Sequence, residues 1–264
     1  MNKAILFAGV DSGHINTKAV VMRRGEILGC ATVPTKFDVV AAVQGALLEA
    51  SKAAGVSLEE IGQIAATGIF KDVAKPADLH VTAAVPEYVA DAKGAFFLNR
   101  NSRAVIDIGG NIHKAITFDG NGDVVDVVQN DKCADGMGIF YTNMAKTLGV
   151  NEEELSDLAL RSTADLSLGV QCALSAESDA IDLMCQGKDI AEVAGAISRF
   201  IVERVADMCT YMNFEEEIVV AGRLARSRAL VRQLGVMLKR DLRVPDLPEY
   251  VGAVGAAISN GGGE

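Results

Sequence analysis

The 264-residue sequence lacks the features that mark several large classes of protein. It has no C-x-x-C pair, so neither a zinc ribbon nor a ferredoxin-type loop is expected. It contains 25 Lys and Arg but 35 Asp and Glu. The resulting net charge of −10 argues against nucleic acid or an anionic membrane surface as a partner. No apolar stretch approaches the roughly 20 residues of a membrane span, and the apolar run before Asp11 is too short for a secretion signal.

The cysteines also argue against a secreted scaffold. They are five in number and widely spaced, at Cys30, Cys133, Cys172, Cys185 and Cys209. An odd count without an export signal makes a disulfide framework unexpected and favours the reducing cytoplasm. The length of 264 residues is enough for one large domain or two ordinary ones. Half of the residues are hydrophobic, which is enough for a sizeable core.

Two segments of the chain resemble each other. Residues 10–20 read VDSGHINTKAV, and residues 106–116 read IDIGGNIHKAI. At a constant offset of 96 residues, Asp11 matches Asp107, Gly13 matches Gly109, and Lys18 matches Lys114. Each segment is typical of a β-hairpin with glycine in its turn. Two unrelated hairpins are one interpretation. A duplicated domain, with lobes at residues 1–100 and 101–264, is the preferred one.

Helical periodicity follows each hairpin. Helices are predicted for residues 37–55, 139–148, 172–184, 190–212 and 251–259, and strands for residues 64–67 and 218–220. The acidic residues 152–154 are predicted to form the first turn of another helix, capped by Asn151. Hairpins followed by helices, twice over, predict an α/β or α+β architecture with two lobes, and α/β is the fold class expected here.

An Asp-x-Gly hairpin has the chemistry to hold a phosphate. Glycine lets the backbone approach closely, the turn amides form an anion nest, and the aspartate can hold Mg²⁺ or orient water. Two such hairpins facing each other would clamp a triphosphate, so we expect nucleotide binding.

The paired hairpins resemble those of the actin, hexokinase and Hsp70 ATPase superfamily. That resemblance implies a duplicated RNase H-like fold with a nucleotide cleft that binds ATP or ADP with Mg²⁺. Asp11 and Asp107 become the candidate catalytic residues. The implied nucleotide contacts are Gly13, His14 and Lys18 (phosphate-1), Gly109, Gly110, Asn111 and Lys114 (phosphate-2), and Ala221, Gly222 and Arg223 (adenosine motif).

Several of these side chains have simpler interpretations. For His14 and His113, a solvated turn histidine is favoured over a phosphate contact. For Lys18 and Lys114, a strand lysine facing solvent is as good an interpretation as a phosphate ligand.

Cys133 and Cys172 each precede a predicted helix. A helix N-terminus carries positive partial charge and favours a thiolate, so the pair has the character of ligands for a metal–sulfur centre. Without further information, a buried structural role for Cys133 and Cys172 is an equally good interpretation. Cys30, Cys185 and Cys209 are interpreted as small buried hydrophobes.

The surroundings of the two cysteines resemble a narrower family. NDKCADGMGIF (residues 130–140) and CALSAESD (residues 172–179) are similar to the cysteine signatures of the BadF/BadG/BcrA/BcrD-type ATPases. These are the activators of 2-hydroxyacyl-CoA dehydratases and the ATPase subunits of benzoyl-CoA reductase. The resemblance implies that Cys133 and Cys172 bind half of a [4Fe–4S] cluster shared across a dimer. It also implies helices that begin at these cysteines and point their positive ends at the cluster.

The resemblance further implies partners. They are a second, identical or homologous ATPase subunit, the catalytic subunits of an acyl-CoA reductase or dehydratase, and a ferredoxin or flavodoxin as electron donor. Asn111, Ile112 and Arg223 depart from the usual nucleotide motifs, and Asp135 and Met137 depart from the usual cysteine loop. These departures favour the small ATPase subunit of a benzoyl-CoA reductase, with the homodimeric dehydratase activator as the alternative. A non-redox kinase or an actin-like assembly protein are the remaining hypotheses.

Overall fold

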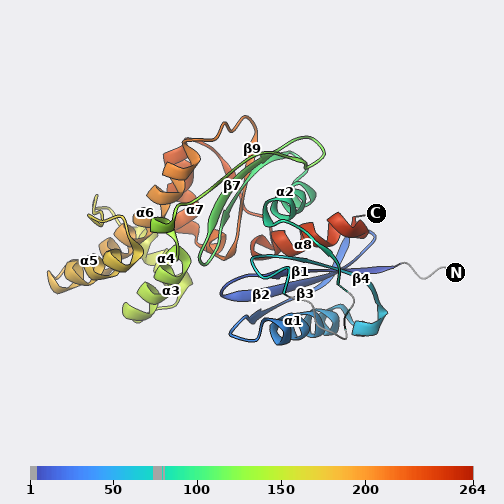
Figure 1. The fold of residues 1–264 in the computed structure, drawn as a ribbon. Coiled ribbons are helices and arrows are strands. Elements are labelled where there is room, and N and C mark those ends of the chain that lie inside the picture. Colours follow the sequence, from blue (N-terminus) through green and yellow to red (C-terminus); the bar gives the residue numbers. More distant parts are fainter. Residues whose placement is uncertain (1–4, 74–78, 80, 264) are drawn as a thin grey trace. The chain divides into compact units, whose positions relative to one another are not determined.

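The computed structural model describes residues 5–73, 79 and 81–263, drawn as a ribbon in Figure 1. Contacts group the described residues into two compact units. The first comprises Met1–Arg103, Phe118–Val125 and Glu249–Glu264, and the second comprises Ala104–Thr117 and Asp126–Pro248. The predicted division into lobes at residues 1–100 and 101–264 stays a prediction. The two units differ from it because residues 118–125 and 249–264 group with the first unit.

The first unit is built on a five-stranded sheet with the order β3-β2-β1-β4-β5. Its strands are β1 (Leu6–Ser12), β2 (Asn16–Arg23), β3 (Glu26–Pro34), β4 (Ile61–Thr67) and β5 (Val81–Ala84). Strands β1, β2 and β3 form antiparallel pairs, whereas β4 runs parallel to β1 and β5 parallel to β4. The predicted hairpin of residues 10–20 is therefore confirmed as the β1–β2 turn.

Helices cover both faces of this sheet. α1 (Val39–Ala54) lies on one face, starts at the side-chain cap of Asp38 and ends at Gly55 in the left-handed region, φ 68°. This confirms the helix predicted over residues 37–55. On the other face lies α8 (Val251–Ala257), with α2 (Glu87–Leu98) beyond it (Figure 1).

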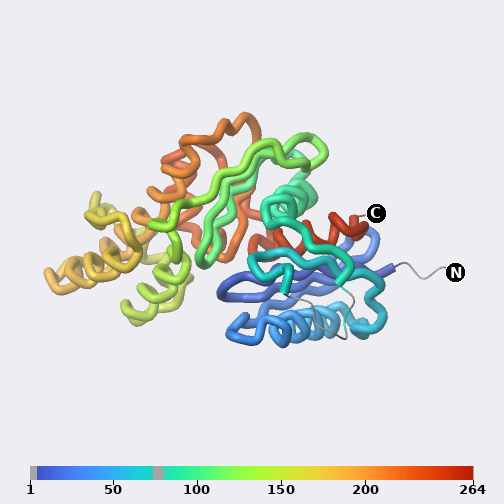
Figure 2. The backbone as a smooth tube through the Cα atoms, viewed as in Figure 1, coloured from blue at the N-terminus to red at the C-terminus, as the bar shows by residue number. Residues whose placement is uncertain are grey.

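The last helix returns to the first strands of the chain, where red and blue segments of the tube run together in Figure 2. Small residues make this approach possible. A Cβ on Gly9 of β1 would lie 1.9 Å from the carbonyl oxygen of Ala253, and one on Gly255 would lie 1.7 Å from that of Ala90. The sequence-distant α8 belongs to the first unit because backbone meets backbone without intervening side chains.

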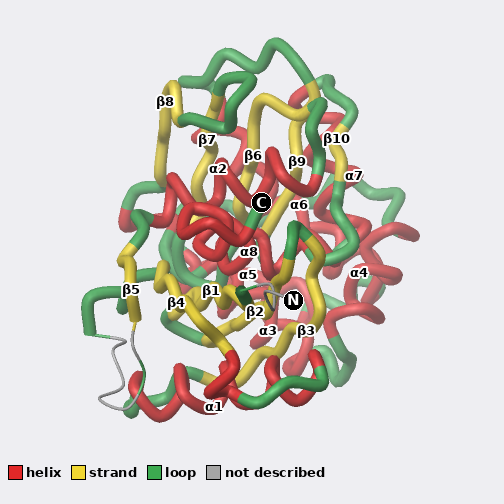
Figure 3. The backbone as a smooth tube through the Cα atoms, turned by 90° about the vertical axis from the view of Figure 1, so that its right-hand side faces the viewer, coloured by secondary structure: helices red, strands yellow, loops and turns green. Residues whose placement is uncertain are grey.

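The second unit contains a five-stranded sheet with the order β10-β9-β6-β7-β8, visible as adjacent yellow strands in Figure 3. Its strands are β6 (Ser102–Ile108), β7 (His113–Phe118), β8 (Val124–Gln129), β9 (Glu217–Ala221) and β10 (Leu242–Arg243). Numbered from its own first strand, this sheet has the order 3-2-1-4-5 when read in reverse, as in the first unit. The equal order confirms an α/β fold built on a duplicated strand pattern.

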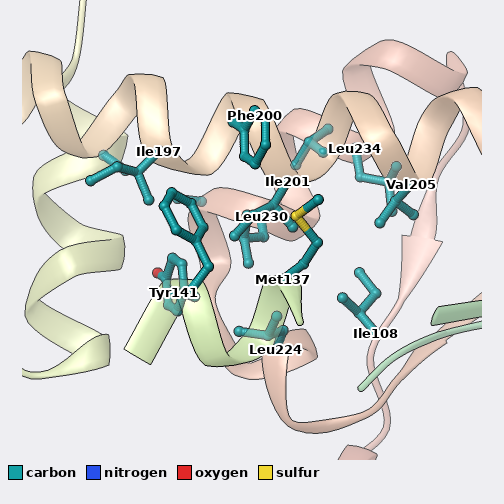
Figure 4. Close-up of a cluster of buried hydrophobic side chains, with 14 of the residues drawn as sticks. Ile108, Met137, Tyr141, Ile197, Phe200, Ile201, Val205, Leu224, Leu230 and Leu234 are labelled. Carbon is teal, nitrogen blue, oxygen red and sulfur yellow. The ribbon is translucent and has the colours of Figure 1, made fainter. Parts of the chain in front are cut away.

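Five helices belong to the second unit. They are α3 (Met137–Thr147), α4 (Glu152–Arg161), α5 (Ala173–Cys185), α6 (Ile190–Cys209) and α7 (Arg228–Leu238). Asn151 caps α4 and forms a capping box with Glu154, as predicted. The helices and the sheet share one apolar core, in which Met137 lies with Ile108, Leu224 and Leu230 (Figure 4).

None of the helices formed by the described residues is both long and apolar enough to cross a membrane.

Candidate nucleotide site and cysteine pair

The hairpin of the first unit pairs an acid with a base across its two strands. Asp11 on β1 lies opposite Lys18 on β2, and Nζ of Lys18 donates to Oδ2 of Asp11 at 2.6 Å. Each of these side chains is 17% exposed. Lys18 therefore does not extend freely into solvent, and its ammonium holds the carboxylate at the end of β1.

The turn that follows is held by backbone and hydroxyl groups. The N–H of Gly13 donates to the carbonyl oxygen of Asn16 at 3.1 Å, and Oγ1 of Thr35 donates to that of Gly13 at 2.7 Å. His14 is exposed and meets the ring of Phe70 edge-on at 5.7 Å. The interpretation of His14 as a solvated turn residue fits this position, and its nucleotide contact stays a prediction.

The hairpin of the second unit repeats the arrangement. Asp107 on β6 lies opposite Lys114 on β7, and Nζ of Lys114 is 3.6 Å from Oδ2 of Asp107. The lysine side chain is only 8% exposed, so the solvent-facing interpretation of Lys114 is wrong. Both sheets thus present a carboxylate and an ammonium at the end of the first strand, the charges that bind Mg²⁺ and phosphate, respectively.

His113 differs from its sequence-based interpretation. It was predicted to be a solvated turn residue, but it lies on β7 and is 1% exposed. Within the described residues, neither ring nitrogen has a hydrogen-bond partner. Burial lowers the pKa of His113 to about 4, with Lys114 adding to the effect. Its imidazole is therefore neutral at pH 7.

The adenosine motif lies directly against the second hairpin. Ala221 ends β9, Gly222 has φ 84° and ψ 169°, and Arg223 opens a short 3₁₀ helix, η3 (Arg223–Arg226). A Cβ on Gly222 would lie 2.4 Å from the carbonyl oxygen of Ile108 and 2.5 Å from Oδ1 of Asp107. Only glycine fits there, so the motif and the phosphate-2 carboxylate form one surface of the second unit.

Cys133 is exposed and lies in a 3₁₀ turn, η2 (Lys132–Ala134). Oδ1 of Asp131 accepts from the N–H groups of Cys133 at 3.0 Å and of Ala134 at 3.1 Å. Cys133 therefore does not begin α3, whose N-cap is Gly136. The expectation that a helix starts at Cys133 is wrong, because the Asp131 cap closes a separate turn first.

Cys172 fulfils the corresponding expectation. It is the N-cap of α5, its side chain is not used in capping, and it is exposed. It therefore lies beside the first N–H groups of α5, at the positive end of the helix dipole.

The other three cysteines have different surroundings. Cys209 is buried at the end of α6, and burial raises the pKa of its thiol to about 12, as befits a structural residue. Cys30 is partly exposed on β3. Cys185 is exposed at the end of α5, so its interpretation as a buried hydrophobe is wrong. The helical period of α5 placed Cys185 among apolar residues, but this helix buries only Ala176 and Ala180.

The two unusual residues of the first cysteine loop have structural roles. Oδ1 of Asp135 accepts from Nδ2 of Asn130 at 2.9 Å and thereby closes the loop on itself. The side chain of Met137 is fully buried in the core of the second unit. Asn130 also accepts the N–H of His113 at 2.6 Å through Oδ1, which ties the loop to β7.

One groove of the second unit is lined by the Cys133 loop and reaches the residue before Cys172. Its lining includes Cys133, Gln171 (the residue before Cys172) and the side chain of Arg204 from α6. Among the described residues, no group of three or more His, Cys, Asp and Glu is arranged to hold a metal ion. Two surface thiols are a donor set that fits half of a four-thiolate cluster, because a second chain can supply the other half.

The sequence did not reveal a polar network that joins the adenosine motif to helices α3 and α4. Nη1 of Arg223 contacts both carboxylate oxygens of Glu152, and Nη2 donates to Oγ1 of Thr142 at 2.7 Å. Glu152 was predicted only as a helix-start residue. The separation of 71 positions between Arg223 and Glu152 leaves no local pattern that reveals the pair.

Known proteins resemble this chain in sequence and in fold. Residues 8–259 match the BadF/BadG/BcrA/BcrD ATPase family. The chain is 30% identical over 250 residues to an activator of lactoyl-CoA dehydratase from Anaerotignum propionicum, covering 95% of both chains. It resembles the solved structure of the activator of 2-hydroxyisocaproyl-CoA dehydratase from Clostridium difficile with bound ADPNP, with a TM-score of 0.89 and 26% identity. That match covers 97% of this chain and 94% of the other.

A component of benzoyl-CoA reductase is also among the relatives. The chain is 28% identical over 212 residues to this reductase component from Thauera aromatica, covering 78% of this chain and 73% of the relative. Other relatives are named as activators of 2-hydroxyisocaproyl-CoA and (R)-2-hydroxyglutaryl-CoA dehydratases. The activators thus match a larger share of the chain than the reductase component.

Proposed function

Since the chain belongs to the BadF/BadG/BcrA/BcrD ATPase family, we propose that it hydrolyses ATP to drive an electron into an acyl-CoA dehydratase. The observation that carries the proposal is the combination of two features. An Asp–Lys hairpin recurs at the same place in two sheets of equal strand order, and Cys133 and Cys172 are both exposed in the second unit. The hairpins supply nucleotide chemistry, and the thiols supply a place for a redox group.

In this proposal the hairpins handle the phosphates. Asp11 and Asp107 hold Mg²⁺ or orient the attacking water, while Lys18 and Lys114 neutralise phosphate oxygens. Each lysine lies beside its aspartate, at 2.6 Å and 3.6 Å, so each hairpin presents both charges at one place. Gly109, Gly110 and Asn111 provide the turn amides, and Gly222 lets the adenosine motif lie directly against Asp107.

Cys133 and Cys172 would hold the cluster together with the same residues of a second chain. A [4Fe–4S] cluster supplies one-electron transfer at a potential set by its protein surroundings. The contribution of this chain is to present two thiols at its surface, with Cys172 at the start of α5 and Cys133 fixed by the Asp131 cap. A ferredoxin or flavodoxin is the proposed electron donor.

The dehydratase activator is preferred over the small ATPase subunit of a benzoyl-CoA reductase. The sequence favours the reductase through the departures at Asn111, Ile112 and Arg223 and at Asp135 and Met137. In the structure Asp135 and Met137 have roles within their own loop and core, so they carry no information about a different partner chain. The near-complete coverage by dehydratase activators supports the activator over the reductase subunit.

One preparation tests the proposal. The chain is purified without oxygen, and its mass in solution, iron, acid-labile sulfide and EPR spectrum after dithionite reduction are measured. We expect a dimer with about four irons per two chains, ATP hydrolysis, and ATP-dependent activation of a 2-hydroxyacyl-CoA dehydratase. A colourless protein that consumes ATP only with a small-molecule acceptor would identify a kinase instead. Activity only in complex with a different ATPase subunit would favour the reductase.

A further inference from the structure

We propose that the Arg223–Glu152 pair is a clamp that transmits the state of the nucleotide to the Cys133 loop. The inference rests on the proposed function and concerns positioning residues of the same site. The pair contacts Gly138 in the first turn of α3 and Thr142 in the next turn. All residues of the clamp belong to the second unit.

The first turn of α3 is attached to the phosphate-2 turn on one side. The N–H of Ile139 donates to the carbonyl oxygen of Gly110 at 3.1 Å, and the N–H of Gly136 donates to that of Asn111 at 2.9 Å. A Cβ on Gly138 would lie 2.6 Å from the carbonyl oxygen of Gly109. The helix start and the phosphate turn are therefore in direct backbone contact, so a shift of one displaces the other.

On its other side, the same turn is attached to the adenosine motif. Nη2 of Arg223 donates to Oγ1 of Thr142 at 2.7 Å and to the carbonyl oxygen of Gly138 at 3.3 Å. Oγ1 of Thr142 is also 3.0 Å from the carbonyl oxygen of Gly138 and 2.7 Å from Oε1 of Glu152. The guanidinium thus links Gly222, beside Asp107, to the helix that follows the Cys133 loop.

Glu152 fixes the guanidinium in this position. Its carboxylate receives Nη1 of Arg223 and Oγ1 of Thr142, and the two charged side chains are 31% and 29% exposed. A half-buried ion pair with a shared hydroxyl has one favoured geometry, unlike an exposed pair between two free side chains. Removal of Glu152 leaves Arg223 without an anionic partner in the network and frees it to change rotamer.

The consequence is a mechanical path of short steps. A change at the γ-phosphate position moves the Gly109–Gly110 turn or the Gly222–Arg223 segment, and both hold the first turn of α3. That turn follows the Cys133 loop by a few residues, and Asn130 ties the other end of the loop to His113 on β7. Coupling requires that the two nucleotide states contact these segments differently.

The test uses the anaerobically purified full-length chain with ADP or with a non-hydrolysable ATP analogue. Hydrogen exchange is followed in the segment 130–142, and the affinity for each nucleotide is measured separately. The variants are Glu152→Ala and Glu152→Gln. Asp157→Asn is the matched control, because Asp157 lies on the same helix and pairs with Arg228 at 2.6 Å on an exposed face.

We expect exchange in segment 130–142 to differ at least about fivefold between the two nucleotides in the wild type and in Asp157→Asn. In Glu152→Ala the difference falls below about twofold, while each nucleotide affinity changes less than about threefold. Glu152→Gln keeps the side-chain volume but loses the charge, so its response lies between the two. If Glu152→Ala does not fold, a reduced response in Glu152→Gln decides in favour of the clamp.

Three results would overturn the clamp. The first is an unchanged exchange response in both Glu152 variants, and the second is an equal loss of response in Asp157→Asn. The third is a collapse of nucleotide affinity in Glu152→Gln, which would make Glu152 part of the binding site. Failure of the wild type to bind either nucleotide would instead overturn the proposed function, so the two failures are distinguishable.

Discussion

Gly222 lies so close to Asp107 that a Cβ at position 222 would be 2.5 Å from Oδ1 of the aspartate. The adenosine motif and the phosphate-2 carboxylate therefore meet without any side chain between them. The glycine also has φ 84° and ψ 169°, a region that other residues rarely occupy. This contact leads to the first prediction.

Gly222→Ala is expected to destabilise the chain by about 3 kcal/mol or more and to abolish ATP binding, because steric overlap adds to backbone strain. Gly149→Ala is the control, since Gly149 has φ 71° but nothing within 4 Å of its Cβ position. It carries only the backbone cost of about 1–2 kcal/mol and keeps ATP binding. Denaturant unfolding and calorimetric titration measure both quantities, and equal effects of the two variants would contradict the overlap.

Gly138→Ala tests the contact between α3 and the phosphate-2 turn. The added Cβ would lie 2.6 Å from the carbonyl oxygen of Gly109, so we expect a loss of about 1–3 kcal/mol and weaker ATP binding. Gly45 in α1 is also a helical glycine, but nothing lies within 4 Å of its Cβ position. Gly45→Ala should stabilise the chain by about 0.5–1 kcal/mol. A stabilising Gly138→Ala would show that α3 does not bear on this turn.

Asp107→Asn is expected to lower the rate of ATP hydrolysis by about 100-fold or more, because the variant loses the carboxylate charge beside the phosphates. The cluster should remain, since Asp107 is not a thiol ligand. Phosphate release and iron content are measured on the same preparation. Asp126→Asn, an exposed change on β8, serves as the control. Undiminished turnover by Asp107→Asn would remove this residue from the catalytic role.

Cys133→Ser and Cys172→Ser are each expected to lose the cluster and retain ATP binding, because the thiols and the hairpins are separate features. Cys185→Ser is the matched control, since Cys185 is equally a surface cysteine of the second unit. It should keep its iron. Iron analysis and visible absorbance give the answer, and loss of iron from Cys185→Ser would show that the ligand assignment is wrong.

His113 is expected to make stability depend on pH. Its pKa is about 4 in the fold and about 6.5 when unfolded, so the unfolded chain binds a proton that the folded chain excludes. The stability from the neutral imidazole is complete above pH 6.5 and is lost as pH falls toward 4, by about 3 kcal/mol in all. Urea unfolding between about pH 7 and pH 4.5 measures this slope.

His113→Leu should remove that part of the slope. An unchanged slope in His113→Leu would mean that the imidazole is solvated or protonated in the fold.

Individual helices and hairpins could be predicted from the sequence where the signal lies within a single short segment. The hairpins, α1, α6 and the Asn151 cap follow from period, glycine position and capping residues that lie within a few positions of one another. The α7 helix and the second-unit strands β8 and β10 were not anticipated, and β10 has only two residues. The two residues of β10 are too few for alternation to stand out, and the six of β8, VVDVVQ, do not alternate.

The amino-acid pattern alone indicates the two Asp-x-Gly hairpins, the family and the two cysteine segments, because these are motifs of fixed residues at fixed spacing. Tertiary structure alone decided that α8 packs on β1, that His113 is buried, and that Cys133 occupies a turn of its own. It also decided that Arg223 meets Glu152. Each of these depends on contacts between residues far apart in the chain, where burial and electrostatic pairing override the local pattern.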